Sequence, residues 1–345
     1  MMTTKFQILR LPRRYPLAIS RGTQALAENL FVSVTDGALT GIGEFSPSIG
    51  AGFGAADGQA QLEAFLATGG DLSSPHAAWA AMRTAGIDPG AMAALDEALW
   101  DLLAKQAGLP LYRLLGLAKG TVPTSLTIGL NPPEVTRERV PEILRRTGAK
   151  LLKIKLGSPA GRNHDQEHFT AAAEAAAPFG VRLRVDANGG WTVNEAIAMD
   201  HWLAARGVEL IEQPLPRGSE AELPRVFAAR TLPIYVDESC HMSADVPALA
   251  RAVDGVNVKL MKCGGITEAL RIVATARAHS LKTMIGCMAE SSVSISAGAA
   301  LGALFDEIDL DSHLNLDPDP AQGALLLDGV VTPTEDHGHG GHLDA

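Results

Sequence analysis

From Thr124 onward, short apolar stretches alternate with helix-like stretches, and this alternation restricts the fold more than any other feature of the sequence. We predict strands over Thr124–Leu130, Leu151–Gly157, Arg182–Asn188, Leu210–Leu215, Ile234–Ser239, Val256–Lys262, Thr283–Met288 and Glu307–Asp311. We predict helices over Pro133–Thr147, Asp165–Ala177, Val193–Arg206, Glu220–Ala229, Ala244–Val253, Thr267–His279 and Ser291–Phe305. Such alternation is typical of a parallel sheet, and this many strands favour a closed barrel. No GxGxxG motif follows a strand, which disfavours a dinucleotide-binding fold. The predicted fold class is α/β, a (β/α)7β TIM-type barrel over residues 121–318.

The first 120 residues have a different pattern and predict a separate α+β domain over residues 1–120. Phe6–Leu9 and Leu30–Val34 resemble antiparallel strands, and Asp36-Gly37 is a hairpin signal. The glycine-rich stretch Gly41–Gly58 lacks both common phosphate-loop patterns, so we interpret it as a mobile surface loop or lid. A helix is expected around Leu95–Leu103, where leucines share one face.

Composition limits the classes of function. The chain has 345 residues and a formal net charge of -10, which disfavours binding to nucleic acid or to an anionic membrane. No apolar run has the ~20 residues of a membrane span, and we recognise no signal peptide. The three cysteines, Cys240, Cys263 and Cys287, show no CxxC spacing and fit a reducing compartment. We therefore expect a cytoplasmic protein without a nucleic-acid or membrane partner.

Charged residues stand at the carboxyl ends of most predicted barrel strands, where the active sites of such barrels lie. Asp186, Glu212 and Asp237 come from three consecutive strands, 26 and 25 residues apart. Adjacent carboxylates repel one another unless a cation lies among them, and an all-oxygen ligand set suits Mg2+, or Mn2+, better than zinc. The alternative is that these carboxylates form salt bridges with nearby lysines.

Three lysines on the same strands suggest acid–base chemistry. Lys153 and Lys155 lie on one face of their strand, because strand side chains repeat every two residues. Two neighbouring ammonium groups should lower each other's pKa, which makes Lys155 a candidate base. Lys259 lies on the opposite strand of the ring, so the two lysines could exchange a proton at opposite faces of one carbon. Lys262 should point elsewhere, as a surface or loop lysine.

Asp309 and Asp311 share a face of the last predicted strand, opposite the strand of Glu212. A cation at one side of the barrel and two acids at the other would fit a substrate with a carboxylate at one end and an ammonium at the other. The alternative is a pair of aspartates that cap loops.

Taken together, these residues resemble the enolase superfamily, specifically its muconate-lactonizing-enzyme subgroup, over essentially the whole chain. The stretch Ala94–Lys105 followed by Gly108–Tyr112 is similar to the signature helix of the N-terminal capping domain. The barrel motifs follow in order: Lys153-Ile154-Lys155, Asp186-Ala187-Asn188, Glu212-Gln213-Pro214, Asp237-Glu238-Ser239 and Lys259–Gly265. Within the subgroup, Asp309-Leu310-Asp311 resembles the Asp-x-Asp motif of dipeptide epimerases.

The resemblance implies an isomerase that inverts the α-carbon of the C-terminal residue of a dipeptide, of the peptidoglycan-derived L-Ala-D/L-Glu type. It implies Lys155 and Lys259 as the two bases, assisted by Lys153, and Mg2+ on Asp186, Glu212 and Asp237. It also implies substrate contacts from Asp309, Asp311, Asn188, Cys287, Met288 and Arg21. Arg21 would hold a glutamate side-chain carboxylate, or else be an ordinary surface arginine. A homo-oligomer is plausible from the apolar barrel helices.

One departure from the family pattern and several alternatives stay open. Residues 319–345 end in a His/Gly-rich stretch, which we expect either to pack on the capping domain or to be flexible, with metal binding a further alternative. The function could instead be that of an N-acylamino-acid racemase or an o-succinylbenzoate synthase. It could also be that of a non-catalytic dipeptide-binding barrel or a Schiff-base aldolase.

Overall fold

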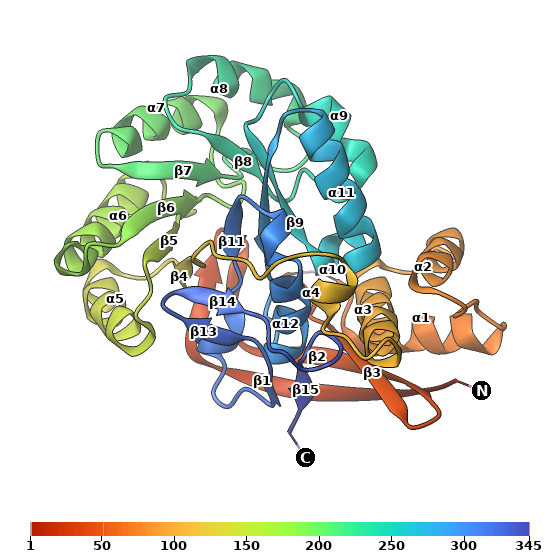
Figure 1. Ribbon diagram of the computed structural model, residues 1–345. Helices are drawn as coiled ribbons and strands as arrows, with labels where there is room; N and C mark the ends of the chain where they lie inside the picture. Colours follow the sequence, from red (N-terminus) through yellow and green to blue (C-terminus); the bar gives the residue numbers. More distant parts are fainter. Residues whose placement is uncertain (1, 51, 345) are drawn as a thin grey trace.

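The computed structural model describes residues 2–50 and 52–344, and its largest element is an eight-stranded parallel sheet. The strands are β4 (Leu126–Ile128), β5 (Leu151–Lys155), β6 (Arg182–Asp186), β7 (Val208–Glu212), β8 (Ile234–Val236), β9 (Gly255–Lys259), β10 (Lys282–Gly286) and β11 (Glu307–Asp309). Each pairs with its neighbours in sequence order. A bridge from Thr124 to Ile308 joins the first strand region to the last. The predicted (β/α)7β barrel is confirmed (Figure 1).

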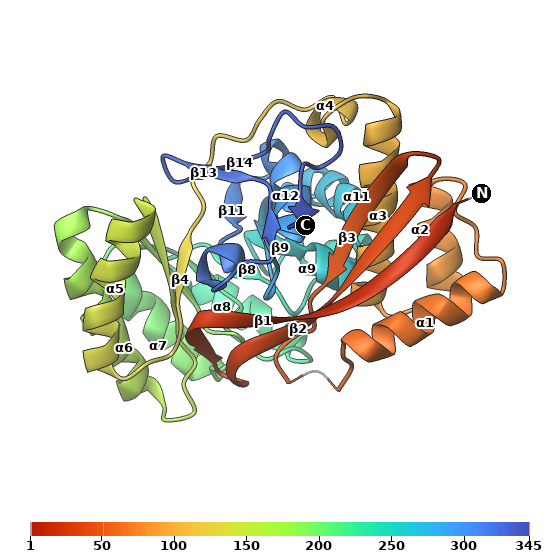
Figure 2. The same ribbon diagram turned by 90° about the horizontal axis from the view of Figure 1, so that it is seen from below.

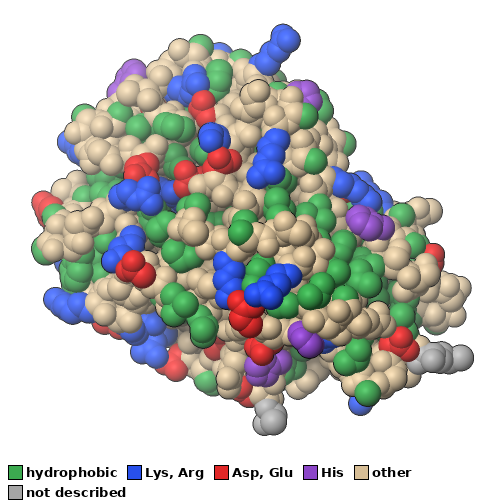
Figure 3. All heavy atoms as spheres, in the orientation of Figure 1, with side chains coloured by type: hydrophobic (Ala, Val, Ile, Leu, Met, Phe, Trp, Pro, Cys, Tyr) green, Lys and Arg blue, Asp and Glu red, His purple; other side chains and the backbone are tan. Residues whose placement is uncertain are grey.

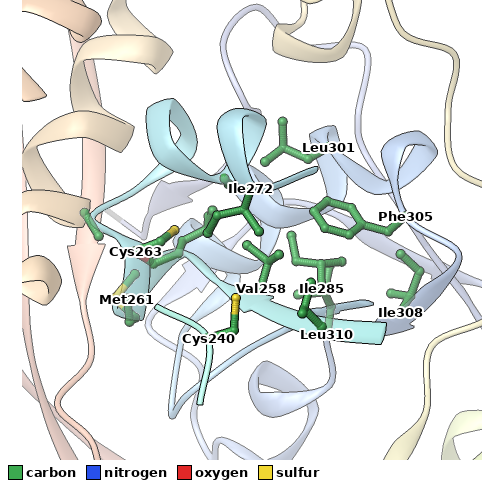
Figure 4. Packing of buried hydrophobic residues seen from close by; sticks show 14 of the residues in the cluster. Cys240, Val258, Met261, Cys263, Ile272, Ile285, Leu301, Phe305, Ile308 and Leu310 are labelled. Atoms are coloured by element: carbon green, nitrogen blue, oxygen red, sulfur yellow. The ribbon is translucent and has the colours of Figure 1, made fainter. Parts of the chain in front are cut away.

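Helices follow the strands and cover the barrel from outside (Figure 1). They are α5 (Pro133–Thr147), α6 (Arg162–Ala176), α7 (Val193–Ala204), α8 (Leu223–Ala229), α9 (Val246–Leu249), α11 (Ile266–Ala278) and α12 (Ser292–Ala300). Figure 4 shows how Ile272 of α11 and Leu301, directly after α12, pack over Val258 and Ile285 of the sheet. Because these apolar contacts hold the strands from outside, the barrel interior is free for polar side chains.

All eight predicted strands extend two or three residues beyond the observed carboxyl ends, and one of them changes structure there. The stretch 256–262 is strand only to Lys259 and then turns into a short helix, α10 (Leu260–Cys263). Gly264 follows with φ of +87°, a left-handed conformation that ends the helix. Lys262 therefore lies on a helical turn, and the strand period does not set its direction.

The N-terminal part is a three-stranded antiparallel sheet with helices on one side (Figure 2). The strands are β1 (Thr3–Ile19), β2 (Gly22–Asp36) and β3 (Leu39–Phe45), and the helices are α1 (Ala55–Ala67), α2 (Pro75–Thr84), α3 (Pro89–Gln106) and α4 (Leu111–Leu114). The interpretation of Gly41–Gly58 as one mobile loop is wrong, because Gly41 and Gly43 belong to β3 and Gly58 to α1. Gly43 is required there, since a Cβ at this position would overlap the carbonyl of Ala94 in α3.

Buried acids of the N-terminal domain hold it against the barrel. Asp96 of α3 accepts hydrogen bonds from the backbone N–H and the hydroxyl of Thr267, at 2.9 and 2.6 Å. Glu44 of β3 accepts from Ser291 and Ser294 at the start of α12. Both carboxylates thus meet the positive end of a barrel helix, which favours a negative charge.

The C-terminal segment lies against the same domain. It contains β12 (Ala321–Gln322), β13 (Leu325–Leu327), β14 (Val330–Thr332) and β15 (His342–Leu343). His339 is 2% exposed, its backbone N–H donates to Asp101 of α3, and its Nε2 lies 2.7 Å from the carbonyl of Ile42. This histidine is a packing residue, not part of a flexible tail.

We expect the buried acids to lower the free energy of unfolding as pH rises from about 4 to about 8, most visibly above about 6.5, where the buried histidines no longer oppose them. Burial raises the pKa of Glu44 to about 6, of Asp96 to about 7 and of Glu290 to about 8. Unfolded carboxyls titrate near ~4, so the folded chain holds protons that the unfolded chain has lost, and rising pH favours unfolding. On the acid side, burial lowers the pKa of His168 and His313 to about 4, which opposes folding as these groups charge.

Urea unfolding at several pH values measures this dependence. The variant Glu290→Gln should show a flatter profile above about pH 7, because its side chain does not titrate. A free energy of unfolding that rises between about pH 6.5 and 8 would contradict the expectation.

Candidate active site

The carboxyl ends of the barrel strands face the β1–β2 hairpin of the N-terminal domain across a cavity of about 690 Å³. Its walls include Lys259 and Asp237 from the barrel, Arg21 from the β1–β2 turn, and Met288 from the loop after β10. The hairpin reaches over the barrel to β4, where the backbone N–H of Leu130 donates to the carbonyl of Ala18 at 2.8 Å (Figure 2). Outside this cleft, Figure 3 shows acidic and basic side chains interspersed on the face it draws.

Three carboxylates line one wall of the barrel interior. Asp186 ends β6, Glu212 ends β7 and stands beside it in register, and Asp237 follows β8. All three are at most 1% exposed. Burial and then the charges of Asp186 and Asp237 raise the pKa of Glu212 to about 7, although Lys153 opposes this. The central carboxylate is therefore under repulsion from both neighbours, which a cation would relieve.

In the structure, lysines supply that positive charge. Lys155 Nζ lies 2.5 Å from Asp186 Oδ2, and Lys259 Nζ lies 2.7 Å from Asp237 Oδ2. Lys153 Nζ lies 3.4 Å from Glu212 and 3.8 Å from Asp186. Within residues 2–50 and 52–344, no three His, Cys, Asp or Glu side chains are already arranged as a metal site. In this structure the three carboxylates therefore form salt bridges with lysines, as the alternative interpretation of the sequence expects.

The donor set nevertheless fits a divalent cation. One ammonium, that of Lys153, lies within 4 Å of two of the carboxylates, so a single positive centre can serve both. Asp237 Oδ1 is buried and accepts no hydrogen bond, although the ammonium of Lys262 stands 2.5 Å away. All three donors are carboxylate oxygens, the type that Mg2+ and Mn2+ prefer.

The pKa of Lys153 differs from the prediction, and that of Lys259 is shifted in the same way. Burial lowers the pKa of Lys153 and Lys259, but the neighbouring carboxylates, led by Asp309 and Asp237 respectively, raise both above the usual value. Lys153 does lower the pKa of Lys259, yet by less than the acids raise it. The prediction counted the repulsion between ammonium groups and assigned the carboxylate charge to a cation. A bound divalent ion would reverse this balance.

The position of Lys262 also differs from the prediction. Its side chain is 5% exposed, and its ammonium donates to the carbonyls of Cys240 and Asn257 at 3.1 and 3.0 Å. It also contacts both the carbonyl and the carboxylate of Asp237. The expectation of a surface lysine is wrong because the turn of α10 directs the side chain back under β8.

The second acidic pair lies on the other side of the barrel. Asp309 pairs with Lys153 and accepts from Ser125 Oγ at 2.6 Å. Burial raises the pKa of Asp309, but the charge of Lys153 outweighs it and holds the pKa below its usual value. Asp311 Oδ2 accepts the backbone N–H of Thr127 at 2.6 Å, so the alternative of a capping aspartate applies to this residue. Lys153 thus connects the two acidic groups across the interior.

The remaining predicted residues lie around the rim. Asn188 Nδ2 donates to Asp186 Oδ2 at 3.2 Å, and Cys287 Sγ donates to the carbonyl of Asp309 at 3.3 Å. Met288 Sδ accepts from Ser48 Oγ at 3.6 Å. Arg21 forms an ion pair of 2.6 Å with Glu238, the residue after Asp237.

Sequence reasoning missed two residues near the site. Asn257 precedes Lys259 by two positions on β9, and its Nδ2 donates to Glu212 Oε1 at 2.7 Å. The two-residue strand period could have identified it. Arg13 of β1 lies in the electrostatic field of Asp311 and Cys287, and its Nε is buried without a partner. Arg13 is far from the barrel in the sequence, so no local pattern indicates that it lies near the site.

Comparisons with known proteins agree over the whole chain. Residues 1–116 match the model of the mandelate racemase / muconate lactonizing enzyme N-terminal domain, and residues 135–345 match the enolase C-terminal domain-like model. A hydrophobic dipeptide epimerase of Roseobacter litoralis is 59% identical over 99% of each chain. An L-Ala-D/L-Glu epimerase of Bacteroides thetaiotaomicron is 37% identical over 71% of this chain and 62% of its own. A crystal structure of an Enterococcus faecalis dipeptide epimerase with Mg and L-Leu-L-Tyr has a TM-score of 0.90 at 32% identity, covering 98% of both chains.

Proposed function

This chain belongs to the mandelate racemase / muconate lactonizing enzyme family of the enolase superfamily, and we propose that it is a dipeptide epimerase. The reaction is inversion of the α-carbon of the C-terminal residue by removal and return of its proton. The observation that carries the proposal is the arrangement of Lys155 and Lys259. They stand beside Asp186 and Asp237, on strands four apart in the barrel, at either flank of the buried carboxylates.

Asp186, Glu212 and Asp237 would hold Mg2+, or Mn2+ in its place. When bound, the ion supplies Lewis-acid stabilisation of the negative charge that develops on the substrate carboxylate. The three acids set the position of that carboxylate, and Asn257 and Asn188 hold Glu212 and Asp186 in place by hydrogen bonds.

The two lysines move the proton. One takes the α-proton from one face of the substrate carbon, and the other returns a proton to the opposite face, so the product has the inverted configuration. In the reverse direction their roles exchange. Lys153 lies between Glu212 and Asp309, a position that suits it to attract the substrate carboxylate and not to act as a base.

Asp309 and Asp311 would bind the free ammonium of the substrate. Asp309 is 2% exposed and Asp311 is partly exposed, and in the structure Asp309 already holds an ammonium, that of Lys153. The relatives named above carry the hydrophobic and the L-Ala-D/L-Glu designations, so the side chain of the substrate differs between relatives of this chain.

A dipeptide library in D2O tests the proposal. The purified protein with Mg2+ is incubated with L,L-dipeptides, and products are analysed by mass spectrometry and chiral chromatography. We expect one solvent deuteron at the α-carbon of the C-terminal residue, together with the L,D-epimer. Binding without exchange would support a non-catalytic barrel instead, and trapping of substrate by borohydride would support a Schiff-base aldolase.

N-acetylation of the substrate is expected to lower kcat/KM by at least about 10²-fold. An acetyl group removes the ammonium and leaves Asp309 and Asp311 without a positive partner from the substrate. Turnover of L-Ala-L-Leu is compared with turnover of N-acetyl-L-Ala-L-Leu, in the wild type and in Asp309→Asn. The control variant is Asp306→Asn, which changes an exposed aspartate. Faster turnover of the acetylated form would favour an N-acylamino-acid racemase.

We also propose a cytoplasmic location and a homo-oligomeric state. No helix in the described part of the chain is long and apolar enough to cross the bilayer. Sedimentation velocity measures the oligomeric state, and a single species at the monomer mass would contradict the second proposal.

A further inference from the structure

The turn between β1 and β2 is fastened to the barrel by three polar contacts. Arg21 Nη1 lies 2.6 Å from Glu238 Oε1 and donates to the carbonyl of Asn188 at 3.1 Å. Ser20 Oγ donates to the same carbonyl at 2.9 Å. Asn188 has φ of 43°, a left-handed conformation that is uncommon for a residue other than glycine. Two donors of the N-terminal domain thus converge on one carbonyl of the barrel.

These contacts continue to the buried carboxylates. Asn188 Nδ2 donates both to Glu238 Oε1 at 3.3 Å and to Asp186 Oδ2 at 3.2 Å. The backbone N–H of Asn188 donates to Asp186 Oδ1 at 2.7 Å. The position of the turn is therefore linked through one asparagine to a residue of the reaction site.

Glu238 makes Arg21 a poor receptor for a second carboxylate. The Glu238 side chain is 17% exposed, and its Oε2 is buried without a hydrogen-bond partner. An acidic substrate side chain at Arg21 would have to displace Glu238, whose charge would then stand unpaired beside the incoming charge. An apolar side chain requires no such exchange.

The cavity beside this pair is suited to an apolar side chain. Ile49, Pro159 and Met288 line it, and Arg21 and Glu238 neutralise each other at its rim, where the exposed Arg217 also lies. With the pair formed, the turn covers the cavity while adding no net charge to it.

We propose that Arg21 and Glu238 form an ionic latch that closes the pocket for the C-terminal side chain and selects against acidic side chains. The selectivity rests on the proposed dipeptide epimerase function. Arg21 is then a positioning residue that acts through Glu238 and Asn188, and the role of holding a substrate carboxylate is not needed.

The variants Arg21→Met and Glu238→Gln test the latch with L-Ala-L-Leu and L-Ala-L-Glu as substrates. We expect Arg21→Met to lower kcat/KM for both dipeptides by about two- to fivefold, because both need closure and the Arg21 side chain is 44% exposed, so that their ratio stays within about threefold of wild type. Glu238→Gln should raise the relative rate with L-Ala-L-Glu, because it releases Arg21. The control is Arg14→Met, which removes an exposed ion pair between Arg14 of β1 and Asp317, 3.2 Å apart. Selective loss of L-Ala-L-Glu turnover in Arg21→Met, with L-Ala-L-Leu unaffected, would overturn the proposal.

Hydrogen exchange gives a second measurement that does not depend on turnover. Arg21→Met should speed amide exchange in residues 19–23, whereas Arg14→Met should not. Unchanged exchange in Arg21→Met would overturn the latch. A wild-type protein that epimerises no dipeptide would instead overturn the proposed function, and the exchange measurement would still decide on the latch.

Discussion

Epimerisation falls by about 10²–10⁴-fold or more when either Lys155 or Lys259 is replaced by alanine, because each supplies one of two proton transfers. Both lysines are buried, with side chains 7% exposed, and each contacts a different carboxylate. No other lysine takes over, since Lys153 is paired with Asp309 and Lys262 is held by backbone carbonyls. Chiral chromatography of a dipeptide substrate over time measures the loss.

Exchange of the α-proton in D2O separates the two bases. Lys155→Ala should still exchange the proton of one epimer, and Lys259→Ala that of the other, because the remaining lysine can remove and return a proton on its own face. The control is Lys282→Ala, which removes an exposed lysine paired with Asp306 at 2.7 Å. If either variant epimerises at nearly the wild-type rate, or if both exchange the same epimer only, the two-base arrangement is incorrect.

The barrel was predictable because its signals are local. The strands are short apolar runs, five of which end in a charged residue, and most of the helices repeat apolar residues every three to four positions. The errors fall where tertiary contacts decide. Gly41 and Gly43 suggest a loop by composition, yet they form a strand because α3 packs too closely for any side chain. The four residues of α10 are too few to show a helical period, so the sequence predicts a strand there.

The residues of the candidate site could be predicted from the sequence, but the ion pairs between its lysines and its acids could not. The two-residue strand period brings Lys153 and Lys155 to one face, and the strand order sets Asp186, Glu212 and Asp237 side by side. Which ammonium meets which acid depends on side-chain length across the barrel. Lys153 of β5 contacts both Glu212 of β7 and Asp309 of β11, and thereby joins two strands on opposite sides of the barrel. The same limit applies to the Arg21–Glu238 pair, which joins two parts of the chain more than two hundred residues apart.

Chelation of Mg2+ is expected to abolish epimerisation, by at least about 10³-fold, while the protein stays folded. The charge that develops on the substrate carboxylate would then lack its main stabilisation. Unfolding is not expected, because Lys153, Lys155 and Lys259 already pair with the three acids in the structure. Activity before and after treatment with EDTA, the thermal midpoint, and recovery with Mg2+ or Mn2+ measure both parts. Parallel loss of structure would show that the lysines do not compensate the acids.

Glu212→Gln separates ion binding from stability at the same position. The amide keeps the shape but removes the charge, so we expect Mn2+ affinity, measured by electron paramagnetic resonance, to fall by about 10²-fold. Because burial and then the charges of Asp186 and Asp237 raise the pKa of Glu212 to about 7, removal of its charge should leave the thermal midpoint at pH 8 unchanged or higher. The matched control is Glu209→Gln on the same strand, where the carboxylate is 34% exposed and pairs with Arg182. It should bind Mn2+ as the wild type does. Equal Mn2+ affinity in Glu212→Gln and wild type would remove Glu212 from the ion site, whereas weak binding together with a raised midpoint would mark it as a residue kept for function at a cost to stability.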